Sequence, residues 1–162
     1  MNKIFGDNQY VRSEAERNDE ALQVYDEIEK YLDEEGMSAA FTDREERTIM
    51  LVYEDKEGTP YFMGIEVSSY PDVCVSFHSV AEVTCKDENV DAMLMLLNQL
   101  NRNKKIGSYR LEDDGSVICE YNYLIFGSKF NREHFLIYLA NCFITPGSNG
   151  FEEIREIAEG GF

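Results

Sequence analysis

Residues 48–68 read TIMLVYEDKEGTPYFMGIEVS, and this stretch predicts a β-hairpin. Its first arm, Thr48–Glu54, is rich in Ile, Leu, Val and Tyr, which favour strands. Its second arm, Pro60–Ser68, follows a polar turn that ends in glycine at Gly58. Alternation along the second arm places four side chains on one face of the predicted sheet: Tyr61, Met63, Ile65 and Val67.

Further strands are predicted on both sides of this hairpin. A short strand over 37–42 precedes it, and a longer one over 73–83 follows a turn at 70–72 that contains proline. The longer strand also alternates, with these side chains on one side: Val73, Val75, Phe77, Ala81 and Val83. Three or four strands joined by short loops predict an antiparallel meander.

Two helices flank this meander in the sequence. The first begins at Ser13, which forms an S-x-x-E capping box with Glu16, and ends at Gly36. Its outer face is densely acidic. The second is predicted over 88–103, with Asp87 as its N-cap. Apolar residues cover more than one face of this second helix, which is typical of a helix buried on two sides or paired with another subunit.

The remaining sequence predicts a second hairpin and two more helices. The arms of the hairpin are 106–111 and 116–126. A third helix is predicted from Asn131 to Thr145, and a polar helix over 151–159 follows a short hinge. The predicted order is therefore α-β-β-β(-β)-α-β-β-α. Helices that pack on a mostly antiparallel sheet give an α+β fold.

The composition limits the function of the protein. Its 162 residues include 32 acidic and 15 basic ones, so the net charge is −17. Such a charge argues against a generic nucleic-acid or anionic-membrane binder, because it repels phosphate. The sequence starts without the apolar segment of a signal peptide and has no apolar run of about 20 residues. We therefore expect a cytoplasmic protein.

Residues with catalytic or metal-binding chemistry form no known motif in this sequence. The four cysteines contain no C-x-x-C pair, and the acidic turn before Gly115 fails the spacing of a calcium loop. The two histidines, His78 and His134, belong to no nucleophile motif. A pairing of Cys119 with His78 in space is the remaining route to an enzyme. We expect no catalytic residue, no metal and no cofactor.

Apolar and aromatic residues in the second helix and the last hairpin form the candidate binding surface. Methionine and tyrosine are common at protein interfaces. The predicted dimer or partner interface consists of Met93, Met95, Leu96, Leu100, Tyr121 and Tyr123. The alternative is that these residues close the core of a single chain.

One part of the sequence resembles a known family. The segment Leu97–Arg102 carries an L-N-x-x-N helix end, which Ile106–Leu111, a D-G turn and a second strand beginning at Ser116 follow. This pattern is similar to the YbjN family. The resemblance implies a type III secretion chaperone-like fold over residues 19–145, with 1–18 as a lead-in and 146–162 as a hinge and C-terminal helix.

The resemblance also implies a kind of function. Proteins of this fold are typically homodimers, secretion chaperones bind protein or peptide partners along apolar patches, and YbjN proteins are described as regulators. The resemblance therefore implies a non-enzymatic, homodimeric, partner-binding protein. The alternative, which rests on the charge of −17, is an acidic immunity protein that inhibits a basic toxin.

Overall fold

The computed structural model of this chain describes the following residues: 12–54, 56–70, 72–104, 107–125, 130–142, 144, 147–148 and 150–160. Most of the predicted lead-in, the predicted end of the third helix at 145 and the predicted hinge positions 146 and 149 lie outside these residues. The elements are α1 (Glu14–Glu34), β1 (Ala39–Asp43), β2 (Thr48–Glu54), β3 (Pro60–Ser68), β4 (Cys74–Thr84), a 3-10 turn (Asp87–Asn89), α2 (Val90–Asn103), β5 (Ser108–Leu111), β6 (Ser116–Leu124), α3 (Arg132–Cys142) and α4 (Phe151–Glu159).

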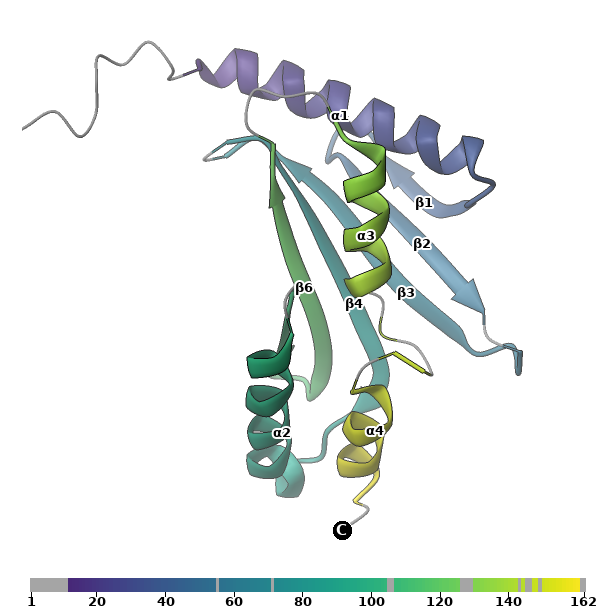
Figure 1. Ribbon diagram of the computed structural model, residues 1–162, viewed down its shortest axis with the longest axis vertical. Coiled ribbons are helices and arrows are strands. Elements are labelled where there is room, and N and C mark those ends of the chain that lie inside the picture. Colours follow the sequence, from purple (N-terminus) through teal and green to yellow (C-terminus); the bar gives the residue numbers. More distant parts are fainter. Residues whose placement is uncertain are drawn as a thin grey trace, which may run out of the picture.

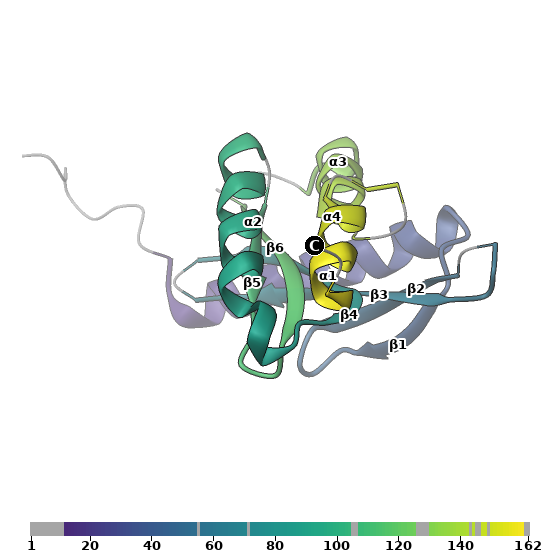
Figure 2. The same ribbon diagram turned by 90° about the horizontal axis from the view of Figure 1, so that it is seen from below.

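The strands form one antiparallel sheet in the order β1-β2-β3-β4-β6-β5. Figure 1 labels β1, β2, β3, β4 and β6, and Figure 2 labels β5. The first four are the predicted meander. The chain leaves β4 through α2 and returns by β5 at the edge, so that β6 can pair with β4. The predicted α+β fold and element order are confirmed.

The helices cover a single face of this sheet. Figure 2 shows α2, α3 and α4 on the same side of the strands. The helix α1 joins them there, because the ring of its Tyr31 packs 6.1 Å from the ring of Phe135 in α3. Both predicted sets of alternating side chains in β3 and β4 turn to this side, and residues such as Met63, Ile65 and Phe77 are buried in the core.

Local capping signals position α1 and α3. The amide of Glu16 donates to Ser13 Oγ at 3.2 Å, and the Ser13 amide donates to Glu16 Oε2 at 2.7 Å, which confirms the capping box. In α3, the His134 amide donates to Asn131 Oδ1 at 3.0 Å. The Phe130 and Phe135 rings lie 5.3 Å apart across this helix start, as a hydrophobic staple requires.

The predicted start of α2 is wrong. Asp87 does not cap the helix, because a 3-10 turn over 87–89 precedes it. The side chain of Asn89 instead donates to the carbonyl of Ile157 in α4 at 2.9 Å. A tertiary hydrogen bond has replaced the local cap, because Asn89 is buried and its amide needs a partner.

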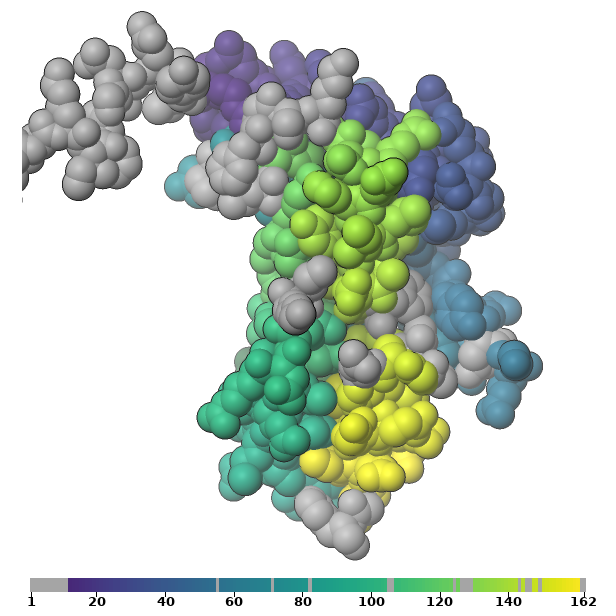
Figure 3. Space-filling model, in the orientation of Figure 1, coloured from purple at the N-terminus to yellow at the C-terminus, as the bar shows by residue number. Residues whose placement is uncertain are grey.

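The last helix is amphipathic and not simply polar as predicted. Phe151, Ile154 and Ala158 of α4 are buried in the common core. Its start is so close to α2 that a side chain at Gly150 would lie 2.6 Å from Leu100. With the Asn89 contact at its other end, α4 runs antiparallel to α2, and Figure 3 shows the two helices side by side.

Among the described residues, no helix combines the length and the apolar character that crossing a bilayer requires.

Candidate functional site

The predicted interface residues of α2 differ in their surroundings. Met93 is fully buried in the core of the chain, whereas 75 % of Met95 is exposed. Leu96 and Leu100 are half-buried and pack on the core. Leu94, which the sequence did not single out for the interface, is exposed beside Met95. The free apolar surface of α2 is therefore centred on Leu94 and Met95.

The two predicted tyrosines pack within the chain, between β6 and α3. The ring of Tyr121 stacks on Tyr138 with 4.5 Å between centroids, and the ring of Tyr123 lies 4.9 Å from Tyr138. Burial, together with the Tyr138 hydroxyl, raises the pKa of Tyr121 to about 12, so the Tyr121 hydroxyl stays protonated at neutral pH. The six predicted residues thus do not form one continuous surface, and their role in an interface stays a prediction.

The face of the sheet opposite the helices carries a row of apolar residues that was not predicted as a binding surface. Strand register aligns Val52, Phe62, Val80 and Ile118 across four strands. In the adjacent row, Phe41 pairs with Met50 on β2. Phe62 is 39 % exposed and Phe41 is 55 % exposed, and no described helix covers them. We call this set, consisting of Phe41, Met50, Val52, Phe62, Val80 and Ile118, the open-face patch. Ile118 of β6 is its one buried member.

A sequence signal for the open-face patch was available. Residues 49–53 and 61–63 are continuously apolar, which is typical of strands with apolar groups on both faces. Alternation within Pro60–Ser68 indicated only the inner set. Because the neighbours of Phe62 in the sequence, Tyr61 and Met63, belong to the inner set, alternation places Phe62 on the opposite face of the sheet.

Gly64 interrupts the second row of this face. It lies in the middle of β3, and a side chain there would meet no atom closer than 3.8 Å. Its backbone is not among the positive-φ positions that favour glycine. Glycine weakens a strand interior and often marks a place where another backbone approaches closely. Its presence between Met50 and His78 is therefore not required by the fold.

The structure separates Cys119 from His78. Cys119 pairs with Ser79 on the helix-covered face, whereas His78 pairs with Glu120 on the open face. The sheet itself lies between the two side chains, so they cannot act as nucleophile and base. A hydrogen bond from Cys142, with the charge of Lys104, lowers the pKa of Cys119. Cys119 is nevertheless fully buried, which closes it to a substrate.

All four cysteines are buried and free. In the part of the chain that the structure describes, no three His, Cys, Asp or Glu side chains gather in a way that could hold a metal ion.

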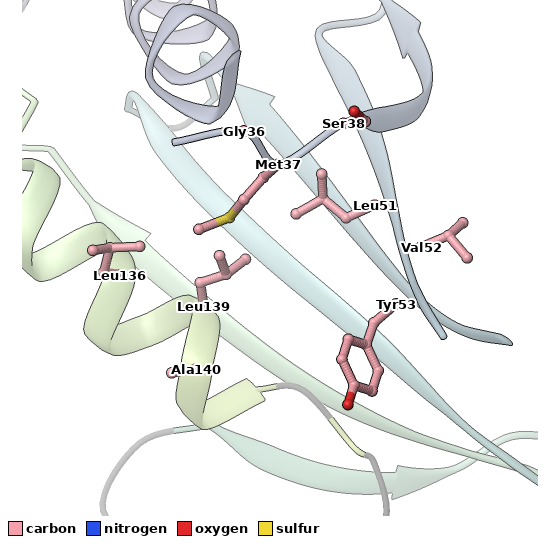
Figure 4. A pocket seen from close by; sticks show the side chains of 9 residues that line it. All are labelled: Gly36, Met37, Ser38, Leu51, Val52, Tyr53, Leu136, Leu139 and Ala140. Atoms are coloured by element: carbon pink, nitrogen blue, oxygen red, sulfur yellow. The ribbon is translucent and has the colours of Figure 1, made fainter. Parts of the chain in front are cut away.

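A cavity of about 530 Å³ opens on the helix-covered side, between the α1–β1 connection, β2 and α3 (Figure 4). Its walls are mostly apolar and consist of Gly36, Met37, Ser38, Leu51, Val52, Tyr53, Leu136, Leu139 and Ala140. A second cavity of about 520 Å³ lies between α1 and β1 and shares Met37 and Ser38 with the first. Acidic residues of α1 line this second cavity: Asp26, Glu29 and Asp33.

Comparisons with known proteins agree with the fold. Residues 25–153 match the model of the YbjN family, whose description is "Putative bacterial sensory transduction regulator". The crystal structure of YbjN from E. coli, described as "a putative transcription regulator", is similar with a TM-score of 0.52 and 16% sequence identity. That likeness covers 83% of this chain and 87% of the E. coli chain. None of the curated proteins matches this sequence.

Proposed function

The chain belongs to the YbjN family, and from this premise we propose that it is a non-enzymatic regulatory protein. In this proposal it binds a protein partner on its open-face patch, and it pairs with a second copy of the chain through α2. The family is described as regulatory, and the separation of Cys119 from His78 removes the one catalytic pair that the sequence offered. The proposal rests chiefly on the open-face patch.

The open-face patch supports a binding role because of its size and position. Large apolar side chains from four neighbouring strands are aligned on one side of the sheet, while every described helix packs on the other. Contiguous apolar surface of this kind is typical of interaction sites. Gly64 adds a shallow place beside Phe62 and Met50 where a partner backbone can approach.

The charges around the patch favour a cationic partner. Glu66 and Glu120 lie on the same face, and Arg110 is already held by Glu112 and Glu120. The whole chain carries a charge of −17. A partner segment with apolar side chains and flanking Lys or Arg residues therefore fits this surface better than an acidic one, because opposite potentials attract during encounter.

The partner surface is tested with a photoreactive benzoyl-phenylalanine placed at position 62 in cells of the native host. We expect a cross-linked adduct of one discrete mass with another protein. A second substitution, Gly64→Val, should abolish this adduct because it fills the approach site. It should not weaken the fold, because glycine costs a strand about 0.5–1 kcal/mol relative to alanine.

The matched control places the same photoreactive residue at the exposed Ile137 of α3, on the opposite side of the sheet. Adducts of equal mass and yield from positions 62 and 137 would contradict the proposal, as would an adduct at 62 that Gly64→Val leaves intact. A cationic partner further predicts that the yield in lysate falls as salt is added.

The pairing through α2 gives a separate prediction for solution mass. The protein should elute and scatter as twice its chain mass of 18.7 kDa, and Met95→Glu should return it to a single chain. Burying a carboxylate in an apolar contact is costly, which is why one charge suffices. Light scattering coupled to size-exclusion chromatography measures the mass directly.

Ile137→Glu is the control for this prediction, because it makes the same change on an exposed helix position elsewhere. Leu96→Glu is a poorer test, since Leu96 packs on the core and its loss affects folding. A wild-type mass of one chain, or a Met95→Glu mass unchanged from a dimeric wild type, would show that α2 is not the dimer contact.

A further inference from the structure

We propose that the apolar cavity between the α1–β1 connection, β2 and α3 binds a small amphiphile, with its apolar tail inside and a cationic head at the mouth. The cavity volume of about 530 Å³ is in the range that holds small organic ligands. The site is on the helix-covered side of the sheet, and Val52 is the one lining residue that it shares with the open-face patch. The inference does not rest on the proposed partner surface.

The walls of the cavity are preformed. The helix α1 ends in a Schellman motif, in which the Met37 amide donates to the Leu32 carbonyl at 2.8 Å and Gly36 adopts a φ of +72°. This turn aims Met37 toward Leu136 and Leu139 of α3, as Figure 4 shows. Leu139 is itself buried against the core, so a ligand does not have to order these walls.

The lining favours an apolar tail. Met37, Leu51, Leu136 and Leu139 offer no hydrogen-bonding side-chain group. The hydroxyl-bearing residues Ser38 and Tyr53 are both more exposed than the leucines. A ligand therefore gains most by burying hydrocarbon among the leucines and keeping its polar end near Ser38 and Tyr53.

The surrounding charge favours a cationic head. The second cavity, which shares Met37 and Ser38, is lined by three carboxylates and by one basic side chain, Lys30. Arg44 neutralises Asp26 at 2.9 Å, but Glu29 and Asp33 form no ion pair with any described residue. The negative end of the α1 dipole lies at the same place, and no basic residue is present in its last turn. The resulting potential attracts a cation and repels an anion.

Lys30 and Arg132, the remaining basic residues near this end of α1, do not cancel that potential. Both pair with Glu34, at 3.7 Å and 2.6 Å respectively. One glutamate is thus shared by two cations, and Glu35 adds a further exposed carboxylate at the helix end. The two basic residues and the two glutamates of this group therefore balance in charge. Glu29 and Asp33 remain as the local excess of negative charge.

The test compares decyltrimethylammonium with decyl sulfate, which share a tail and differ in the sign of the head. Calorimetric titration below the micelle concentration of each should show at least tenfold tighter binding of the cation. In methyl NMR spectra, the signals of Met37 and Leu139 should shift, while those of Leu94 on α2 should not. Equal affinity for the two compounds, or shifts centred on α2 or on the open-face patch, would overturn the assignment.

A filling substitution tests the cavity itself. Ala140→Phe adds a ring at an exposed wall position of α3 and should weaken binding of the cation at least tenfold. Ile137→Phe adds a ring on the same helix away from the cavity and should leave the affinity within twofold. Equal affinity in the two variants would overturn the site.

A charge substitution tests the local potential against the overall charge. The double substitution Glu29→Gln with Asp33→Asn should weaken binding of decyltrimethylammonium severalfold. The affinities for the cation and for decyl sulfate should then lie closer together. Glu152→Gln with Glu153→Gln removes the same charge from α4 and should change the affinity by less than twofold. If the α4 substitutions have the larger effect, the cation is attracted by the charge of the whole chain, and the proposed position of its head group is wrong.

Discussion

Replacing Phe135 with alanine is expected to lower the free energy of unfolding by about 3–5 kcal/mol. Its side chain is fully buried, and its ring lies between three others: Tyr31 of α1 at 6.1 Å, Phe77 of β4 at 5.3 Å and Phe130 at 5.3 Å. The ring thus joins two helices to the sheet, and its removal leaves a cavity that these elements cannot all close. Urea denaturation followed by circular dichroism measures the loss.

Phe62→Ala is the matched control, because Phe62 has the same side chain on the open face of the sheet. We expect it to change the free energy of unfolding by at most about 1 kcal/mol at the same protein concentration. Similar losses for Phe62→Ala and Phe135→Ala would contradict the assignment of Phe135 to the core and of Phe62 to the surface.

Replacing Asn101 with alanine is expected to cost about 2–4 kcal/mol and to loosen β5. The Asn101 side chain accepts from the Tyr109 amide at 2.6 Å and donates to the Tyr109 carbonyl at 2.9 Å. It therefore bonds one residue of β5 in the way a neighbouring strand would, and β5 has β6 on its other side only. Tyr109 is buried, so water cannot readily replace both bonds.

Hydrogen exchange measures this effect locally. The Tyr109 amide should exchange at least tenfold faster in Asn101→Ala. The exchange rates of the β3 amides should rise only as far as the loss of global stability requires. Asn98→Ala, at an exposed position of the same helix, should change the stability by no more than about 0.5 kcal/mol. A similar loss for both variants would show that helix α2, and not β5, had been disturbed.

The Asn101 bond also explains part of the sequence resemblance. In the L-N-x-x-N pattern, an asparagine near the end of a helix can bind exposed carbonyls there or secure the following strand. Asn101 does the second, through both atoms of its amide. The L-N-x-x-N helix end is thus a connection between α2 and β5, and it is structural in this chain.

Features that depend on near neighbours in the chain were predictable from the sequence. The strand Pro60–Ser68 has the predicted bounds, the Ser13 capping box is formed, and Gly36 ends α1. Each of these depends on alternation, on a side chain three residues away or on a single backbone conformation. Such interactions are complete within a few residues, so the sequence specifies them locally.

Features that depend on distant segments were not predictable in the same way. Asp87 has the chemistry of an N-cap, but the bond from Asn89 to Ile157, 68 residues away, decided how α2 begins. Met93 and Met95 are both apolar residues of one helix, and only the position of the core separates the buried one from the exposed one.

The sequence alone therefore determined the elements, their order, the inner face of the central hairpin and the acidic character of the chain. Only the tertiary structure decided that every described helix packs on that inner face, which leaves Phe62 and its neighbours exposed on the other. The physical reason is that local periodicity sets the direction of a side chain, whereas its burial depends on which distant segment packs over it. The cavity between Met37 and α3 has the same origin, since its walls come from three elements far apart in the sequence.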